Sequence, residues 1–168
     1  MSLHADLLAQ AEYLARRESK RPKQASLRRA ISAAYYALFH LLISEAARHF
    51  VTDDKLINSI NRFYGHKEMN EVSKSFAKDD WPKAFDSVKG VFAIPPELQN
   101  VAQAFVVLQQ ARHDADYNLA KKFTRSDAAS FVEQAKNAFE AWNTVRRHDL
   151  AKIYLACFLI WDKWNKTR

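Results

Sequence analysis

Residues that break or cross-link a chain are scarce in this sequence. Among 168 residues there are two glycines, Gly65 and Gly90, four prolines and a single cysteine, Cys157. So few breakers disfavour an all-β fold with many tight turns and favour long helices. One cysteine excludes an internal disulfide framework and a cysteine-rich zinc site, and its apolar neighbours predict a buried, inert thiol. We therefore expect an all-α fold with neither a metal centre nor a cofactor.

A long hydrophobic run is also missing. The longest strongly apolar stretch, Ile153–Trp161, is too short to span a bilayer and is flanked by Lys152 and Asp162. The N-terminal stretch MSLHADLLAQAEYLARR lacks the charged, apolar and small-residue order of a secretory signal peptide. These features predict a protein that does not enter a membrane and is located in the cytoplasm.

The composition is that of a folded and basic protein. Hydrophobic residues make up 48% of the chain, which excludes general disorder, and its length suits one domain over 1–168. Lysine and arginine total 26 against 19 acids, a net charge of +7 that favours encounters with polyanions. Basic residues gather from Arg16 to Arg29, where Glu18 is the only acid, and again from Arg146 to the C-terminus. Such runs form either a solvated surface or a nucleic-acid contact.

Apolar residues recur at helical spacing along most of the chain. They predict four long helices, at about 2–20, 24–50, 97–121 and 125–147. Shorter helices are expected between residues 53 and 76, and an apolar C-terminal helix at about 149–165. The stretch 79–96 holds three of the four prolines, which predicts the least regular connection, with one helical turn. The pattern favours an up-and-down antiparallel bundle with extra short helices, on which the C-terminal helix either docks or forms a dimer contact.

The stretch QQARHDADYNL, residues 109–119, places charged groups inside an apolar helix. On a helical wheel Arg112 falls within the apolar stripe, and Asp116 lies one turn further along on the same side. Burying an unpaired guanidinium costs several kcal/mol, so we expect an Arg112–Asp116 pair. His113 and Tyr117 are also one turn apart and lie on the flank of the helix.

A second polar stripe runs along the helix that begins near residue 24. Arg29, Ala33, Tyr36 and His40 are spaced so that they follow one line along it. If this stripe faces the helix of Arg112, the bundle contains an internal polar seam. The alternative is that His40 is a satisfied core histidine and Tyr36 a packing aromatic with a tethered hydroxyl.

Two segments carry a family resemblance over about residues 5–145. The segment SLRRAISAAYYALFHLL, residues 26–42, followed by ARHDADY, residues 111–117, resembles the HEPN superfamily (higher eukaryotes and prokaryotes nucleotide-binding domain). The closer likeness is to its small bacterial stand-alone proteins. The resemblance implies an up-and-down helical bundle that forms a homodimer. Many members are metal-independent endoribonucleases of toxin–antitoxin or defence systems, and others are non-catalytic partners of a nucleotidyltransferase.

The catalytic motif of that family is matched only in part. It consists of an arginine, often a polar residue next to it, and a histidine four to six positions after the arginine. Arg112 and His113 match the first two positions, but Tyr117 stands where the histidine is usual. Cleavage through the ribose 2′-hydroxyl needs a proton acceptor and a cation. Arg112 can supply the cation, whereas a tyrosine with a pKa of about 10 is a poor base.

We therefore assign two sets of candidate site residues. The candidate catalytic residues are Arg112, His113, Asp116 and Tyr117. The candidate residues for binding nucleic acid or another anion are Arg28, Arg29, Tyr36 and His40.

Three functions stay open. The first is an RNA-binding protein or metal-independent endoribonuclease, and the incomplete motif leaves enzymatic activity undecided. The second is a non-catalytic partner or scaffold for a nucleotidyltransferase or another protein, which the tyrosine at the histidine position favours. The third is a nucleotide-binding protein, although no phosphate-cradling glycine loop is present.

Overall fold

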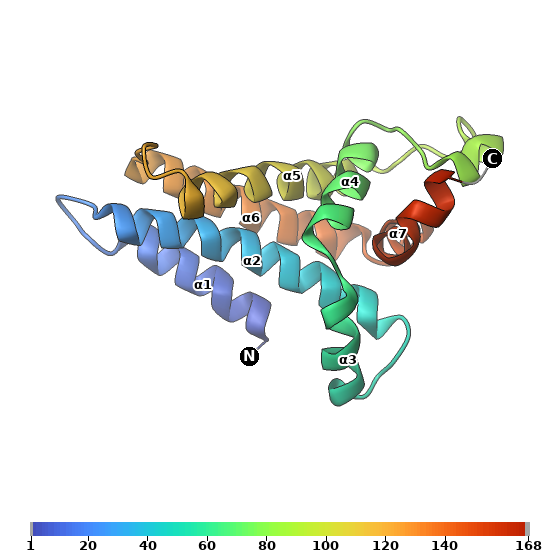
Figure 1. The fold of residues 1–168 in the computed structure, drawn as a ribbon, viewed down its shortest axis with the longest axis horizontal. Coiled ribbons are helices and arrows are strands. Elements are labelled where there is room, and N and C mark those ends of the chain that lie inside the picture. The colour runs from blue at the N-terminus through green and yellow to red at the C-terminus, as the bar shows by residue number, and fades with distance from the viewer. Residues whose placement is uncertain (1, 167–168) are drawn as a thin grey trace. The chain divides into compact units, whose positions relative to one another are not determined.

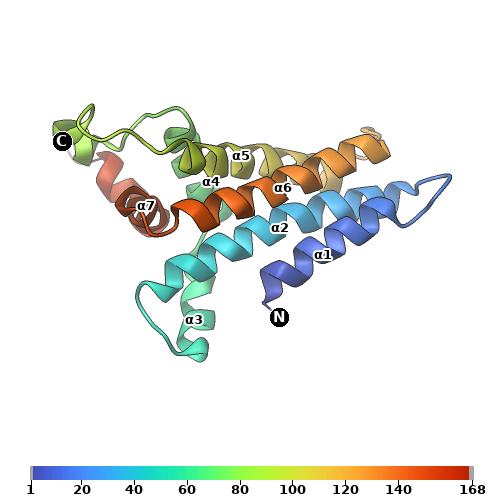
Figure 2. The ribbon, with the colours of Figure 1, turned by 180° about the vertical axis from the view of Figure 1, so that it is seen from behind.

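Helices form nearly all regular structure in residues 2–166, the part of the chain that this computed structural model describes. The α-helices are α1 (Leu3–Arg16), α2 (Gln24–Arg48), α3 (Asp54–Ile60), α4 (His66–Ala77), α5 (Pro96–Tyr117), α6 (Arg125–Val145) and α7 (Asp149–Lys166). Two 3-10 turns, η1 (Asn61–Phe63) and η2 (Lys83–Val88), complete the series (Figures 1 and 2). Within this range no strand forms, and the pairing of Lys89 with Phe92 is an isolated bridge. The predicted all-α fold and helical bundle are confirmed.

The predicted bounds of α1 and α5 are too long. α5 ends at Tyr117 rather than near 121, and Arg28 binds carbonyl groups in its last turn and in the segment that follows. The guanidinium donates hydrogen bonds to the carbonyl oxygens of Ala115 at 2.7 Å and Asn118 at 3.0 Å, and also to that of Lys121. The last carbonyls of a helix have no partner within the helix, so an arginine in this position ends it favourably.

The loop after α1 is held by an acid. α1 ends at Arg16 rather than near 20, and Glu18 then accepts hydrogen bonds from the hydroxyl of Ser26 at 2.7 Å and from the backbone of Lys23 at 3.3 Å. These two bonds, the first of them the larger influence, lower the pKa of Glu18 below its usual value. The turn into α2 is therefore stabilised by the only acid in the first basic cluster.

Side chains cap the first turns of α6 and α3. Thr124 and Asp127 form a capping box at α6, with the threonine hydroxyl accepting from the Asp127 backbone at 3.1 Å and the carboxylate accepting from the Thr124 backbone at 2.7 Å. The cap of α3 is Asp53, whose carboxylate accepts from the backbone of Lys55 and Leu56. Both caps satisfy N–H groups that the helix itself leaves free.

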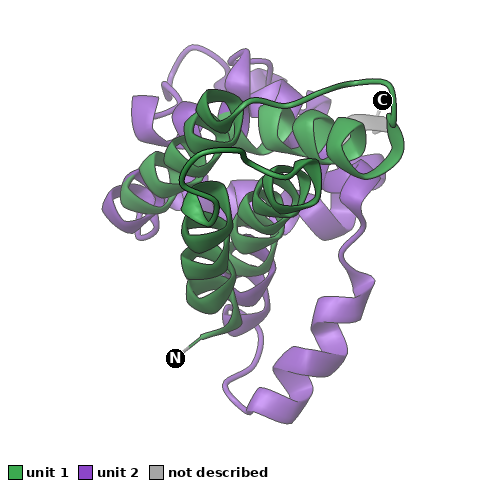
Figure 3. Ribbon diagram, turned by 90° about the vertical axis from the view of Figure 1, so that its left-hand side faces the viewer, with its two compact units in different colours: residues 1–41, 104–140 green, residues 42–103, 141–168 purple. Residues whose placement is uncertain are grey.

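The chain divides into two compact units (Figure 3). Unit 1 comprises residues 1–41 and 104–140, and unit 2 comprises residues 42–103 and 141–168. Three of the long helices, α2, α5 and α6, contribute residues to both units.

Unit 1 is built from α1 and parts of α2, α5 and α6, which lie side by side in Figures 1 and 2. Glu12 of α1 pairs with Lys136 of α6 at 2.9 Å, and His4 contacts Phe139 further along. Because the residue numbers rise on α1 as they fall on α6, these two helices are antiparallel. The core includes residues of all four helices: Ala11, Ala15, Leu27, Ile31, Tyr35, Leu38, Phe105, Leu108, Val132 and Ala135.

Unit 2 is organised around aromatic packing between α4 and α7. Tyr154 is fully buried, with its ring 5.1 Å from that of Phe76 and 4.7 Å from that of Phe158. Its hydroxyl lies 2.8 Å from that of Ser73, so the buried polar atom has a partner. The apolar C-terminal helix therefore packs on α4 and η2 within this unit, and a dimer contact through it stays a prediction.

Cys157 lies on the same helix and is buried, as expected. Burial raises the pKa of its thiol to about 12. A protonated thiol is unreactive, so the prediction of an inert cysteine agrees with its surroundings.

α2 passes a length-and-composition test for a membrane span, although 78% of its apolar window is buried inside the structure. The central helix of a globular bundle passes the same test, because it is apolar on nearly all sides.

Candidate functional site

Arg112 of α5 is held by contacts from its own helix and from α2. Its side chain is 19% exposed, and its Nε atom lies 2.9 Å from Oδ2 of Asp116. The Nη2 group donates a hydrogen bond of 2.7 Å to the hydroxyl of Tyr36. Nε is buried and is not directed at the carboxylate well enough for a hydrogen bond, so this contact is an ion pair. The predicted Arg112–Asp116 pair is confirmed.

Two tyrosine rings complete the surroundings of the guanidinium. Cζ of Arg112 lies 5.3 Å from the ring centroid of Tyr36 and 5.4 Å from that of Tyr117. Both distances suit a cation–π interaction. The ring of His113 lies 5.2 Å from that of Tyr117, which is 62% exposed. The histidine and tyrosine therefore lie together on the flank of α5, as the wheel indicates.

Burial of Arg112 opposes its charge. The phenol of Tyr36 and the carboxylate of Asp116 outweigh this effect and raise the pKa of Arg112 above its ordinary value. The group is a permanent cation with one nitrogen, Nη1, that donates to no residue among those described. A fixed cation with a spare donor is suited to an anion such as a phosphate.

The structure adds one residue that the sequence analysis missed. Ser32 of α2 is buried, and its hydroxyl donates a hydrogen bond to the carboxylate of Asp116. Ser32 and Tyr36 are four residues apart, so they lie on the same face of α2 and reach the two members of the ion pair. The spacing of four residues could have linked Ser32 to Tyr36 in the sequence. A serine in an alanine-rich helix does not by itself indicate a functional role. We call Arg112, Asp116, Ser32, Tyr36, Tyr117 and His113 the Arg112 cluster.

A groove of about 460 Å³ opens beside this cluster within unit 1. Ser32 and Tyr36 line it, so the groove reaches the residues that hold Asp116 and Arg112. Arg17 and Arg29 line it as well. Arg29 is exposed and makes no ion pair with a described residue, whereas Arg17 lies 4.0 Å from Glu18. The groove therefore carries two arginines of its own and adjoins, through Tyr36, the arginine that Asp116 holds.

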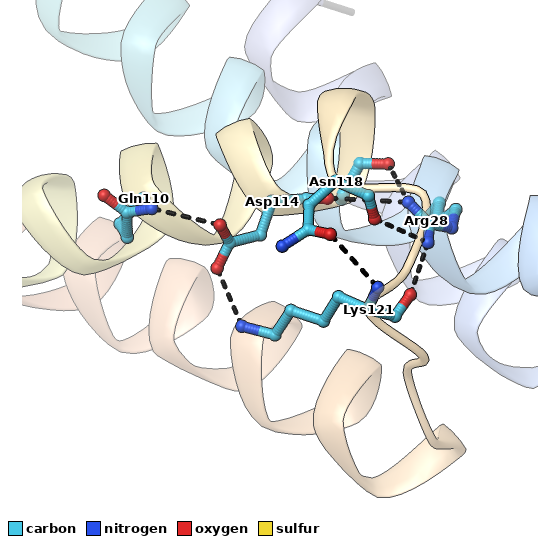
Figure 4. A network of polar contacts seen from close by, with 6 residues as sticks. Arg28, Gln110, Asp114, Asn118 and Lys121 are labelled. Carbon is cyan, nitrogen blue, oxygen red and sulfur yellow. Dashed lines mark hydrogen bonds and ion pairs between the residues drawn. The ribbon is translucent and has the colours of Figure 1, made fainter.

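Arg28, the neighbour of Arg29, is placed differently. Its donors are occupied by the carbonyl groups at the end of α5, so it positions this end of the helix (Figure 4). In the same network Lys121 pairs with Asp114 at 2.7 Å. The hydrogen bond from Lys121, followed by one from Gln110, holds the pKa of Asp114 below its usual value.

The members of the predicted polar stripe on α2, Arg29, Ala33, Tyr36 and His40, contact different parts of the site. Tyr36 bonds to Arg112, while Arg29 and Ala33 line the groove. His40 is half-buried, with its ring 6.4 Å from that of Tyr36. The two histidines of this region thus contact different tyrosines, His40 beside Tyr36 and His113 beside Tyr117.

In residues 2–166 no group of three or more histidine, cysteine, aspartate or glutamate side chains is placed to hold a metal ion. Comparison with models of protein families, with curated proteins and with solved structures finds no match for this chain.

Proposed function

We propose that the chain is a HEPN-like RNA-binding protein whose phosphate contacts are made by Arg112 and Arg29. The observation that carries this proposal is the held guanidinium of Arg112, beside a groove that two further arginines line. Arginine is well suited to phosphate because its planar donors match two phosphate oxygens at once. The net charge of +7 adds a long-range attraction for a polyanion.

Cleavage is the further step of the same proposal. In a metal-independent endoribonuclease of this kind, Arg112 would stabilise the charge that develops on the phosphate. Tyr117 stands in the histidine position, so we propose as proton acceptor His113, which lies against Tyr117, or His40, which lies beside Tyr36. As in the family that it resembles, we propose that the protein acts as a cytoplasmic homodimer in a toxin–antitoxin or defence setting.

Binding and cleavage are tested separately. Fluorescently labelled single-stranded and hairpin RNAs are titrated with protein at two salt concentrations, and their anisotropy is measured. Arg29→Ala is expected to weaken binding to all sequences alike and to reduce the salt slope by about one, because a single phosphate contact is lost. Arg62→Ala, which removes an exposed arginine outside the groove, is the matched control.

Arg112→Lys keeps the charge but loses the paired donors, and we expect it to weaken binding more than Arg29→Ala does. Cleavage is followed by gel electrophoresis in EDTA for the wild type, His113→Ala and His40→Ala. Cuts that persist in EDTA and disappear in one histidine variant would establish the endoribonuclease. If Arg29→Ala and Arg112→Lys both bind RNA as Arg62→Ala does, the proposal is wrong.

A second candidate is supported by a different observation. Tyr117 and Leu119, at the end of α5, are 62% and 79% exposed. Large exposed apolar side chains suit a protein contact. A non-catalytic partner of a nucleotidyltransferase would use this surface. Co-purification with the product of a neighbouring nucleotidyltransferase gene, abolished by Tyr117→Ser together with Leu119→Ser, would favour this function over RNA binding.

A further inference from the structure

A second basic site lies entirely within unit 2. A cavity of about 560 Å³ is lined by Arg48, Arg146, Arg147 and Lys152, together with His49 and one acid, Glu45. These residues come from the end of α2, from the link between α6 and α7, and from the first turns of α7. The volume lies in the range of small-molecule sites, about 300–1,000 Å³.

Three of the four cations in this cavity already have acidic partners. Arg146 pairs with Glu45 at 2.9 Å, Lys152 with Asp149 at 2.8 Å and Arg48 with Asp54 at 3.6 Å. The arrangement is anchored further by Trp142, whose indole donates to the carboxylate of Glu45 at 3.2 Å.

Arg147 is the exception. Its exposed side chain makes no hydrogen bond and no ion pair with any residue in the described part of the chain. The cavity therefore has one uncompensated guanidinium among cations that are held in place, which suits a ligand with a single phosphate group.

An apolar cavity adjoins this basic one. It has a volume of about 570 Å³ and is lined mainly by Trp81, Phe85, Val88, Phe92, Leu150 and Ile153. Trp81 and Phe85 contact each other with ring centroids 6.0 Å apart, and Phe92 is 54% exposed. Trp81 is buried, whereas Phe85 and Phe92 are partly open to solvent and are suited to stack on a flat ring.

Arg147 lines both cavities. Its neighbours His148 and Asp149 line the apolar one, so the link between α6 and α7 forms the boundary at which the two meet. The Nδ1 atom of His148 accepts the backbone N–H of Leu150 at 3.1 Å, which ties the link to the first turn of α7.

We propose that the two cavities together form a site for a phosphorylated aromatic compound, of which a nucleotide unit is the common biological case. The aromatic ring occupies the cavity between Trp81 and Phe92, and Arg147 binds the phosphate at the edge of the basic cavity. The aromatic half of such a ligand would occupy one cavity and the phosphate the other. A molecule that joins the two therefore binds more tightly than either part alone.

The proposal is tested by titration calorimetry on the whole chain with adenosine monophosphate, adenosine and ribose 5-phosphate as probes. We expect the nucleotide to bind at least about tenfold more tightly than each of the two fragments. Arg147→Ala should weaken binding of the nucleotide about tenfold and leave adenosine unchanged. Phe92→Ala should weaken binding of the nucleotide and of adenosine but not of ribose 5-phosphate.

Matched controls lie outside both cavities in the same unit. Arg62→Ala and Phe63→Ala remove an arginine and a phenylalanine that are also exposed, Phe63 to 77%. They should bind every probe as the wild type does. Both test variants replace exposed side chains, so an unchanged urea midpoint should accompany the loss of binding.

A further pair of probes distinguishes a free nucleotide from the phosphorylated end of an RNA chain. A 5′-phosphorylated adenosine hexanucleotide and the same oligomer with a 5′-hydroxyl are compared with the mononucleotide. Tight binding of the phosphorylated oligomer alone indicates the end of an RNA chain, and equal binding of the mononucleotide indicates a free nucleotide. The proposal is overturned if no probe binds saturably, or if Arg147→Ala and Phe92→Ala bind as their controls do. Arg112→Lys should not affect the titrations with adenosine monophosphate, adenosine and ribose 5-phosphate, whereas it should weaken RNA binding in unit 1, so this site and the proposed RNA contact fail separately.

Discussion

Each unit has an arginine near the end of a long helix, and the two arginines differ in whether other side chains bind them. In unit 1, Arg112 is paired with Asp116, bonded to Tyr36 and enclosed by two aromatic rings. In unit 2, Arg147 is exposed and has no partner among the described residues, while the cations around it are paired. A held arginine contributes to stability as well as to binding, whereas a free one is available to a ligand at no cost to the fold. The difference can be measured.

The largest expected effect is on the stability of the two alanine variants. Arg112→Ala leaves a partly buried carboxylate and a phenol without their partner, so we expect the free energy of unfolding to fall by about 1–3 kcal/mol. Arg147→Ala should change it by less than about 0.5 kcal/mol, as is usual for exposed sites. Urea denaturation followed by circular dichroism measures both. Equal losses would show that the two arginines do not differ in this way.

A smaller effect separates the two tyrosines that contact Arg112. Tyr36→Phe removes the hydroxyl that accepts from Nη2 and is expected to cost about 1 kcal/mol. Tyr117→Phe keeps the ring and removes a hydroxyl that bonds to no described residue, so it should leave the urea midpoint unchanged. A larger loss of stability in Tyr117→Phe than in Tyr36→Phe would contradict the assignment of the stabilising hydrogen bond to Tyr36.

The two smallest effects concern helix caps, and the first of them depends on pH. Hydrogen bonds from the backbone and hydroxyl of Thr124 lower the pKa of Asp127 below its usual value. Such a carboxylate stabilises the fold above its unfolded pKa of about 3.9, and this contribution is lost as the pH falls through the lower folded pKa. Asp127→Ala should cost about 0.5–1 kcal/mol at pH 7, at the low end for caps because the site is exposed. The difference from the wild type should shrink below about pH 4.

Asp53→Ala is the comparison in unit 2. It removes the cap of α3, a seven-residue helix with Ile57 as its buried residue. Because so little of α3 is packed, its loss should fray the helix locally and change the global midpoint less than Asp127→Ala does. A greater effect of the α3 cap would mean that unit 2 depends on α3 more than its packing indicates.

The local features of this protein could be read from single helices. The spacing of apolar residues predicted the long helices, including the start of α6 at residue 125. The Arg112–Asp116 pair followed from a separation of four residues, which fixes neighbours on any helix. Each of these depends on residues close in the sequence, where helical geometry alone determines what is near.

Contacts between residues far apart in the sequence could not be predicted from helical geometry. The stripe on α2 suggested a polar seam, but whether Tyr36 or Arg29 met Arg112 depended on how two helices are rotated against each other. Arg28 and Arg29 are adjacent and alike in the sequence, yet the first is bound to carbonyl groups at the end of α5 and the second lines a groove. Adjacent residues on a helix point about 100° apart, so packing gives them different neighbours.

The sequence by itself thus determined an all-α chain, its long helices, and a buried charge that required a partner, because these follow from periodicity and from the cost of burying an ion. Only the tertiary structure decided which cations are held and which are free. It brought the link between α6 and α7 to the boundary of an aromatic and a basic cavity, because those linings come from segments far apart along the chain.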